Sequence, residues 1–181
     1  MNVVRTRRTS NNRRRGSSII EFALVGSFMF LPILAGLATV GLSLVTALQV
    51  SSLNSNAGQM FAAGVDFTQS SNLAIVGKLS GNLNITGTSG YGLLILSEID
   101  GTSNGNTCSN QIIVGNSAIG SSRYCPNPPC VQSGFTALMG GSALAVGQVS
   151  YVAETFYNNP LYAWALAPHG TGTGIYTSAV F

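Results

Sequence analysis

Side chains that could perform catalysis are few in this 181-residue sequence, and they do not converge. Glu98 and Asp100 are two residues apart, so both carboxylates fall on one face of a strand, but acid–base catalysis needs further converging groups. His169 is the sole histidine and lies in a Gly- and Thr-rich stretch without a G-x-S-x-G or comparable motif. We therefore predict no enzymatic activity and interpret the two acids as a solvated strand end.

The three cysteines, Cys108, Cys125 and Cys130, are close enough in sequence to form a disulfide. Disulfides form in exported domains because those compartments are oxidising. We expect Cys108 to pair with Cys125 or Cys130, and a Cys125–Cys130 bridge across CPNPPC is the alternative. With one distant histidine and no second cysteine pair, the sequence predicts no metal site and no cofactor.

One carboxylate, Glu21, stands inside the start of a long apolar run, and the next charged residue is Asp66. An acid at the centre of a membrane helix costs about 2.5–3.5 kcal/mol, and less near an end. Glu21 could be an interfacial acid at a helix N-terminus. Alternatively, a cut after Gly16 makes Ser17 a free amino terminus. Glu21, one helical turn along, can then pair with an ammonium group of its own chain or of a neighbour.

The elements that must position these residues fall into three segments. Residues 1–16 are basic and lack apolar periodicity, which predicts a disordered leader that is removed if the chain is cut. Residues 17–66 form a hydrophobic helix that exceeds the ~20 apolar residues needed to span a bilayer and then becomes amphipathic. Pro32 is expected to bend this helix. Residues 67–181 form an exported β-rich domain.

Alternation and apolar runs in the last segment predict several strands. One is YGLLILSEID, ending at an Asp100-Gly101 turn, and QIIVGN follows it. A third covers residues 146–156, and the end of the chain supplies a short last strand or a tail. We expect an α+β fold in which a small antiparallel sheet packs against the second half of the long helix.

Charge is scarce and unevenly distributed. Only 7% of the residues are charged, whereas a typical soluble domain has about 25%. Six of the eight basic residues precede Gly16. This stretch has no interleaved aromatic residues and stops at an apolar run, so we predict no nucleic-acid partner. Positive charge beside a membrane segment stays in the cytoplasm. Arg13, Arg14 and Arg15 therefore predict a cytoplasmic N-terminus, a single span in contact with membrane lipid, and an exported C-terminal domain.

The stretch RRGSSIIEFALV, residues 14–25, resembles the class III signal of type IV pilin-like proteins. In that pattern a glycine is followed by four residues, a glutamate and an apolar helix. Phe22 directly after Glu21 resembles the Glu-Tyr or Glu-Phe pair of tight-adherence (Flp/Tad) pilins and pseudopilins. The Pro-containing helix and the long segment after it are most similar to the TadE-like pseudopilins. The resemblance covers mainly residues 13–50.

This resemblance implies a structural part in place of a catalyst. A prepilin peptidase, which is a membrane-embedded aspartic protease, would cut between Gly16 and Ser17 at the cytoplasmic side of the bacterial inner membrane. The Tad inner-membrane assembly platform would then extract the helix and join it to other pilins or pseudopilins in an extracellular pilus. Glu21 would match a neighbouring amino terminus, with Phe22 beside it in the helix contact.

Two other interpretations follow from the residues. In the first, the chain is an uncleaved single-pass membrane protein that keeps its leader, and its exported domain binds a partner or an envelope polymer. Glu21 is then only an interfacial acid. In the second, the chain is a membrane-anchored hydrolase, which requires a catalytic constellation that the sequence does not contain.

Overall fold

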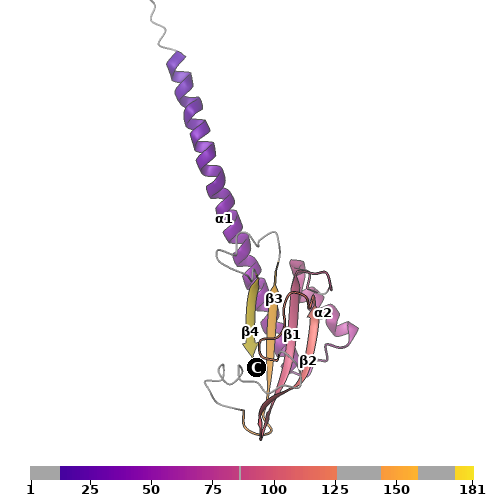
Figure 1. Ribbon diagram of the computed structural model, residues 1–181. Helices are drawn as coiled ribbons and strands as arrows, with labels where there is room; N and C mark the ends of the chain where they lie inside the picture. The colour runs from indigo at the N-terminus through magenta and orange to yellow at the C-terminus, as the bar shows by residue number, and fades with distance from the viewer. Residues whose placement is uncertain (1–12, 86, 126–143, 159–173) are drawn as a thin grey trace, which may run out of the picture. The chain divides into compact units, whose positions relative to one another are not determined.

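The computed structural model describes residues 13–85, 87–125, 144–158 and 174–181 (Figure 1). The chain divides into two compact units, Met1–Gly41 and Leu42–Phe181. Helix α1, Arg13–Ala62, has 50 residues and belongs to both units. It begins inside the segment predicted to be a disordered leader. Arginine is a good helix former, which favours extension of the apolar helix back to Arg13.

The end of α1 is a Schellman motif, in which a glycine after the helix adopts a left-handed conformation. The Gly64 N–H donates to the Phe61 carbonyl at 2.9 Å, and the Val65 N–H donates to the Met60 carbonyl at 3.0 Å. Gly64 has a φ of 86°, which a residue with a Cβ rarely adopts. The helix was expected to end near residues 64–66, and this motif ends it slightly earlier, at Ala62.

A short helix that the sequence analysis missed follows α1. Helix α2, Ser70–Ser80, leads into the 3-10 turn η1, Gly81–Leu83. Before it, the Asp66 carboxylate accepts hydrogen bonds from the Thr68 N–H at 2.9 Å and the Thr68 hydroxyl at 2.7 Å. These bonds hold the pKa of Asp66 below its usual value. The resulting turn directs the chain into α2, a helix that the predicted strands of this β-rich domain did not include.

The described strands after η1 form one antiparallel sheet, as predicted. Its strands are β1 (Gly92–Thr102), β2 (Gly105–Gly115), β3 (Val149–Tyr157) and β4 (Ile175–Val180). Their order in the sheet is β2-β1-β3-β4, and every neighbouring pair is antiparallel. Figure 1 shows β2 and β4 at the two edges.

The turn predicted at Asp100-Gly101 was placed too early. Strand β1 continues to Thr102, and residues 103 and 104 form the hairpin turn into β2. Gly101 stays in the strand because residues 144–148 pack against it. Its N–H donates to the Gln148 carbonyl at 2.8 Å, and a Cβ at this position would lie 2.2 Å from the Ala145 carbonyl oxygen.

The core lies between the sheet and the C-terminal part of α1, which confirms the predicted packing. Val50, Leu53, Ala57 and Phe61 are buried and recur every three or four residues, so they form one stripe along the helix. This stripe belongs to one cluster with residues from β1, β3, α2 and the segment that follows α2, including Leu94, Leu96, Ala153, Tyr157, Val76 and Leu83. Figure 1 shows this part of α1 passing behind the sheet.

Candidate membrane helix and disulfide-linked face

Helix α1 contains the only described segment that is long and apolar enough to cross a membrane, the 45-residue stretch Ser18–Ala62. Every large apolar side chain from Ile19 to Leu48 is at least 50% exposed. Water does not favour such a surface, whereas the hydrocarbon of a bilayer does. The helix can therefore serve as a membrane anchor, which agrees with the coarser part of the predicted localisation.

Two hydroxyl side chains in this part of α1 are satisfied within the helix itself. The Ser27 hydroxyl donates to the Ala23 carbonyl at 2.8 Å, and the Thr39 hydroxyl donates to the Ala35 carbonyl at 2.7 Å. Bonds of this i to i−4 type leave no hydroxyl hydrogen unpaired in an apolar medium. The segment is thus suited to lipid despite its serine and threonine residues.

The sequence-predicted site residues at the start of the chain all lie in α1. Arg13, Arg14, Arg15, Gly16 and Ser17 occupy its first turns, so the proposed cleavage bond is within helical backbone. Glu21 and Phe22 follow on the same helix and are exposed, Phe22 to 82%. The helix continues through Pro32, and the bend expected there stays a prediction.

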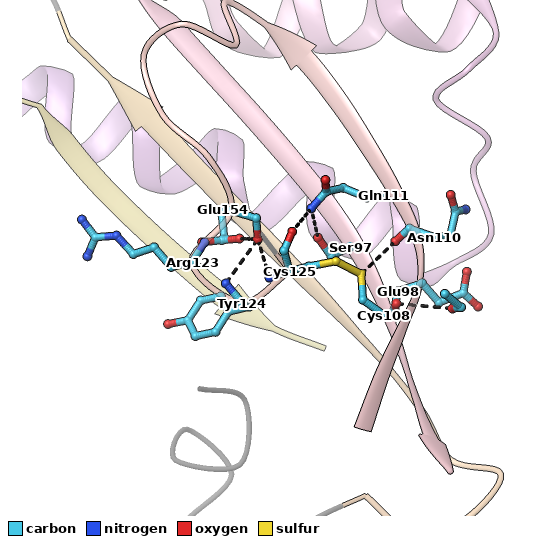
Figure 2. Close-up of a disulfide and its surroundings, with 11 residues drawn as sticks. Ser97, Glu98, Cys108, Asn110, Gln111, Arg123, Tyr124, Cys125 and Glu154 are labelled. Atoms are coloured by element: carbon cyan, nitrogen blue, oxygen red, sulfur yellow. Dashed lines mark hydrogen bonds between the residues drawn. A yellow bond between two sulfur atoms is a disulfide. The ribbon is translucent and has the colours of Figure 1, made fainter. Parts of the chain in front are cut away.

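A disulfide joins Cys108 of β2 to Cys125, with 6.1 Å between the Cα atoms (Figure 2). This confirms the predicted pairing of Cys108 with one of the two later cysteines. Cys130 lies outside the described residues. The bond ties the segment after β2 to the face of the sheet that is opposite to α1. Beside it, the Gln111 side-chain amide donates to the Cys125 carbonyl at 2.8 Å.

A buried carboxylate next to this disulfide was not anticipated from the sequence. Glu154 of β3 is 0% exposed. Its carboxylate accepts hydrogen bonds from the Ser122 hydroxyl, from the Arg123 N–H at 2.9 Å and from the Tyr176 hydroxyl at 2.9 Å. Three donors compensate the burial of this polar group, so Glu154 holds the 122–125 segment and β4 against β3.

Two side chains complete the surroundings of Glu154. Burial, together with the nearby Glu154 carboxylate, raises the pKa of Tyr176, so its hydroxyl stays protonated and donates. The Arg123 guanidinium lies 3.9 Å from the centre of the Tyr176 ring, in a cation–π contact. Figure 2 shows the Arg123 side chain pointing away from the disulfide. The sequence did contain one signal for this cluster, since Glu154 is a charged residue in the middle of β3.

The side chains of Glu98 and Asp100, the two acids considered in the sequence analysis, are not among the hydrogen-bond partners of Glu154. Both lie on β1 and are half-buried. Among residues 13–85, 87–125, 144–158 and 174–181, no group of three or more His, Cys, Asp or Glu side chains could hold a metal ion. His169 lies outside these residues. The described face therefore contains a buried carboxylate with three hydrogen-bond donors and a disulfide.

A buried polar pair lies between α1 and the sheet. The Thr155 hydroxyl of β3 donates to the Asn54 side-chain carbonyl of α1 at 2.9 Å, and both residues are at least 99% buried. The amide nitrogen of Asn54 has no hydrogen-bond partner among the described residues. A directional bond inside an apolar interface favours one alignment of helix and sheet.

Comparisons with protein-family models, with curated proteins and with solved structures find no match for this chain. The structural class of the protein is therefore described from its own fold and sites. It has one N-terminal helix able to cross a membrane, followed by a small antiparallel sheet domain that α1 supports on one face and a disulfide stabilises on the other.

Proposed function

We propose that this chain is a minor pseudopilin, a structural component of a tight-adherence (Tad/Flp) type IV pilus or a related secretion system. A prepilin peptidase processes it after Gly16, and the domain after α1 is exported across the bacterial inner membrane. Its partners are the peptidase, other pilins or pseudopilins, the Tad assembly platform and membrane lipid. Its role is assembly, without catalysis.

The observation that carries this proposal is the position of Glu21. It is the only charged residue between Ser17 and Val65, and it follows Gly16 by five positions in the exposed apolar part of α1. A carboxylate there is costly in lipid unless a positive group compensates it. An amino terminus at Ser17, on the same chain or on an adjacent one, supplies that group. In the cleaved chain, Glu21 would therefore pair with an amino terminus that exists only after processing.

The domain supports the same proposal in a second way. The C-terminal part of α1 is also the central helix of the domain core, so anchor and domain are joined by continuous helix. A subunit that moves from membrane to filament by extraction of its helix needs such a connection. The disulfide between Cys108 and Cys125 suits a domain exposed to an oxidising compartment.

The first test is the mass of the mature N-terminus in native membranes. We expect a chain that begins at Ser17. Gly16→Leu should abolish this processing, because a side chain at Gly16 obstructs the peptidase. Gly36→Leu is the matched control, since it makes the same change in α1 where a Cβ meets nothing within 4 Å, and it should be processed normally. A wild-type chain that begins at Met1 in a host with an active prepilin peptidase would favour the uncleaved anchored binding protein.

The second test separates processing from assembly. Glu21→Ala and Glu21→Gln should both be cleaved after Gly16 but recovered poorly in sheared pili, because each lacks the charge that pairs with the amino terminus. Pilus incorporation is measured by immunoblot of the sheared fraction against the membrane fraction. Normal incorporation of both variants would refute the pairing argument even if cleavage occurs.

A further inference from the structure

The two edge strands of the sheet lack the charged residues and prolines that often prevent edge-to-edge association. Strands β2 and β4 form the edges (Figure 1), and neither contains a charged residue or a proline. A bulge at Ser109 interrupts β2, because Glu98 pairs with Asn110 while Ile99 pairs with Cys108. Beyond it, residues 110–115 form a regular edge of six residues, and β4 is also six residues long.

The hydrogen-bonding phase of β2 identifies the backbone groups at its edge. The Asn116 N–H donates to the Gly92 carbonyl at 3.0 Å, and Val114 is opposite Leu94. Alternation then directs the backbone of Val114 toward β1 and that of Gln111 and Ile113 away from it. Ile113 is 52% exposed, and no described strand pairs with this side of β2.

The same argument applies to β4. Phe181 and Tyr151 exchange two backbone hydrogen bonds of 2.8 and 3.1 Å, so Phe181 faces β3. Alternation directs the backbone of Ser178 and Val180 away from β3. Ser178 also lies on the disulfide face of the sheet, since its hydroxyl is 3.4 Å from that of Tyr124. Gln111 lies on this face too, because its side chain reaches the Cys125 carbonyl.

Strand direction makes the two edges complementary. Because all neighbours in the order β2-β1-β3-β4 are antiparallel, β2 and β4 run in opposite directions. A second copy in the same orientation therefore places its β4 antiparallel to β2 of the first. The same orientation also keeps α1 of both copies parallel, as two single-pass anchors in one membrane require.

The helices on the opposite face fit the same repeat. Four strands at about 4.8 Å give a repeat of about 19 Å, and two helices packed at 8–10 Å need about the same width. The helices α1 and α2 both pack on this face, in one core cluster. A groove of about 320 Å³ lies beside the β2 edge, lined by Ser70, Leu73, Ala74, Gly77, Ile113 and Val114. Its small residues leave room for an adjacent chain.

We propose that a second copy of this chain binds at the β2 edge through its β4 strand, with Ile113 opposite Ser178 of the second copy. Gln111 then faces Val180, which gives two hydrogen-bonded residue pairs on matching faces. A register shifted by two residues, with Gln111 opposite Ser178, would bring β4 onto the bulge at Ser109. Of these arguments, only the shared membrane orientation rests on the proposed function. The contact is head-to-tail, because β4 of one copy binds β2 of another, so it can continue from copy to copy.

The test is cysteine cross-linking of the full chain in its native membranes, in a Cys130→Ser background. A hydrogen-bonded pair has Cα atoms about 5.5 Å apart, within the range of a disulfide. Co-expressed Ile113→Cys and Ser178→Cys chains should give at least tenfold more cross-linked dimer than Ile113→Cys with Val180→Cys, which is out of register. Equal yields, an Ile113→Cys homodimer of equal yield, or cross-links mainly to another protein would each overturn the proposal.

A second comparison guards against misfolding and separates the two proposals. Co-expressed Ser178→Cys and Gln111→Cys chains place the two cysteines two residues out of the proposed register. Their yield of cross-linked dimer should stay at the level of the out-of-register control. Ile113→Glu should reduce dimers recovered with an amine-reactive cross-linker at least fivefold, because it places a charge on the edge strand without adding an amine. Ile113→Val should not reduce them, and both variants must retain the Cys108–Cys125 disulfide. Unchanged dimers in a correctly oxidised Ile113→Glu chain would also contradict the pairing. Processing at Ser17 is scored separately, so either proposal can fail alone.

Discussion

The two parts of α1 make the most instructive comparison in this molecule. In the N-terminal part, residues 18–48, apolar side chains occur on all sides and are exposed. In the C-terminal part, residues 49–62, Val50, Leu53, Ala57 and Phe61 form one buried stripe, and Ser51, Ser52, Asn56 and Gln59 are exposed. An apolar surface on all sides matches lipid, whereas one apolar stripe matches a protein core. The arrangement of apolar residues around the helix thus indicates what surrounds each part.

The polar residues of the two parts differ in the same way. Ser27 and Thr39 bond to carbonyl groups of their own helix, and they need no partner elsewhere. Asn54 instead accepts its hydrogen bond from Thr155, a residue 101 positions away on the sheet. The N-terminal part is therefore self-sufficient, while the C-terminal part depends on the sheet. Substitutions matched between the two parts can test this difference.

The largest effect is expected from shortening a leucine in each part. Leu53→Ala should lower the free energy of unfolding of the sheet domain by about 2–5 kcal/mol, because it leaves a cavity at a buried position. Leu37→Ala, at a position that is 65% exposed, should leave that free energy unchanged. Hydrogen exchange of the β1 and β3 amides in the detergent-solubilised chain measures both. A similar loss of protection in both variants would contradict the division of α1.

An added charge should have its effect in the N-terminal part of α1, on membrane insertion, and not in the C-terminal part. Leu37→Arg should weaken membrane insertion by about 2.5–3.5 kcal/mol, which is roughly 100-fold, because it places a cation near the centre of the apolar span. Gln59→Arg replaces an exposed polar residue in the C-terminal part and should have no effect on insertion. The measurement is the fraction of chain that resists alkaline extraction from membranes. If Leu37→Arg remains fully embedded, the N-terminal part does not span the bilayer as inferred.

Periodicity and length were sufficient to predict the long helix, the antiparallel sheet and its packing on the second part of α1. Those features depend on patterns repeated along a whole element, in which one irregular position has little weight. Helix α2 was missed because its start depends on the local hydrogen bonds of Asp66 with Thr68. The turn after β1 was misplaced because Gly101 is required by residues 144–148, which are distant in sequence.

In the candidate site too, features that depend on local sequence could be predicted, and features that depend on distant residues could not. Cys108 could be assigned to a disulfide from composition, but its choice of Cys125 depends on how the segment after β2 returns to the sheet. Glu154 was not identified, because its three donors come from residues 122, 123 and 176. A charged residue within a strand can be noticed in the sequence, but its distant donors cannot be identified from local spacing. The role proposed for Glu21 is different, since it depends on a processed terminus and on neighbouring chains.

Removal of the disulfide should affect the domain and leave the anchor intact. The double variant Cys108→Ser/Cys125→Ser should lose about 3 kcal/mol of domain stability, since the two cysteines are 17 residues apart. Membrane insertion should not change, because the bond lies in the sheet domain. Urea titration of the hydrogen-exchange protection, with alkaline extraction in parallel, measures both quantities. A loss of insertion would show that the N-terminal part depends on the folded domain.

The smallest effect concerns the polar pair between α1 and the sheet. Thr155→Val should cost about 1–3 kcal/mol, because it leaves the buried Asn54 carbonyl without its donor. Adding Asn54→Leu should recover part of that loss, since both partners are then apolar, and the double-mutant cycle gives the coupling directly. Thr39→Val is the matched change in the N-terminal part and should cost less than about 0.5 kcal/mol, because its hydroxyl bonds only a carbonyl of its own helix. Equal costs at Thr39 and Thr155, measured by exchange of the β3 amides, would mean that the sheet does not distinguish the two parts of α1.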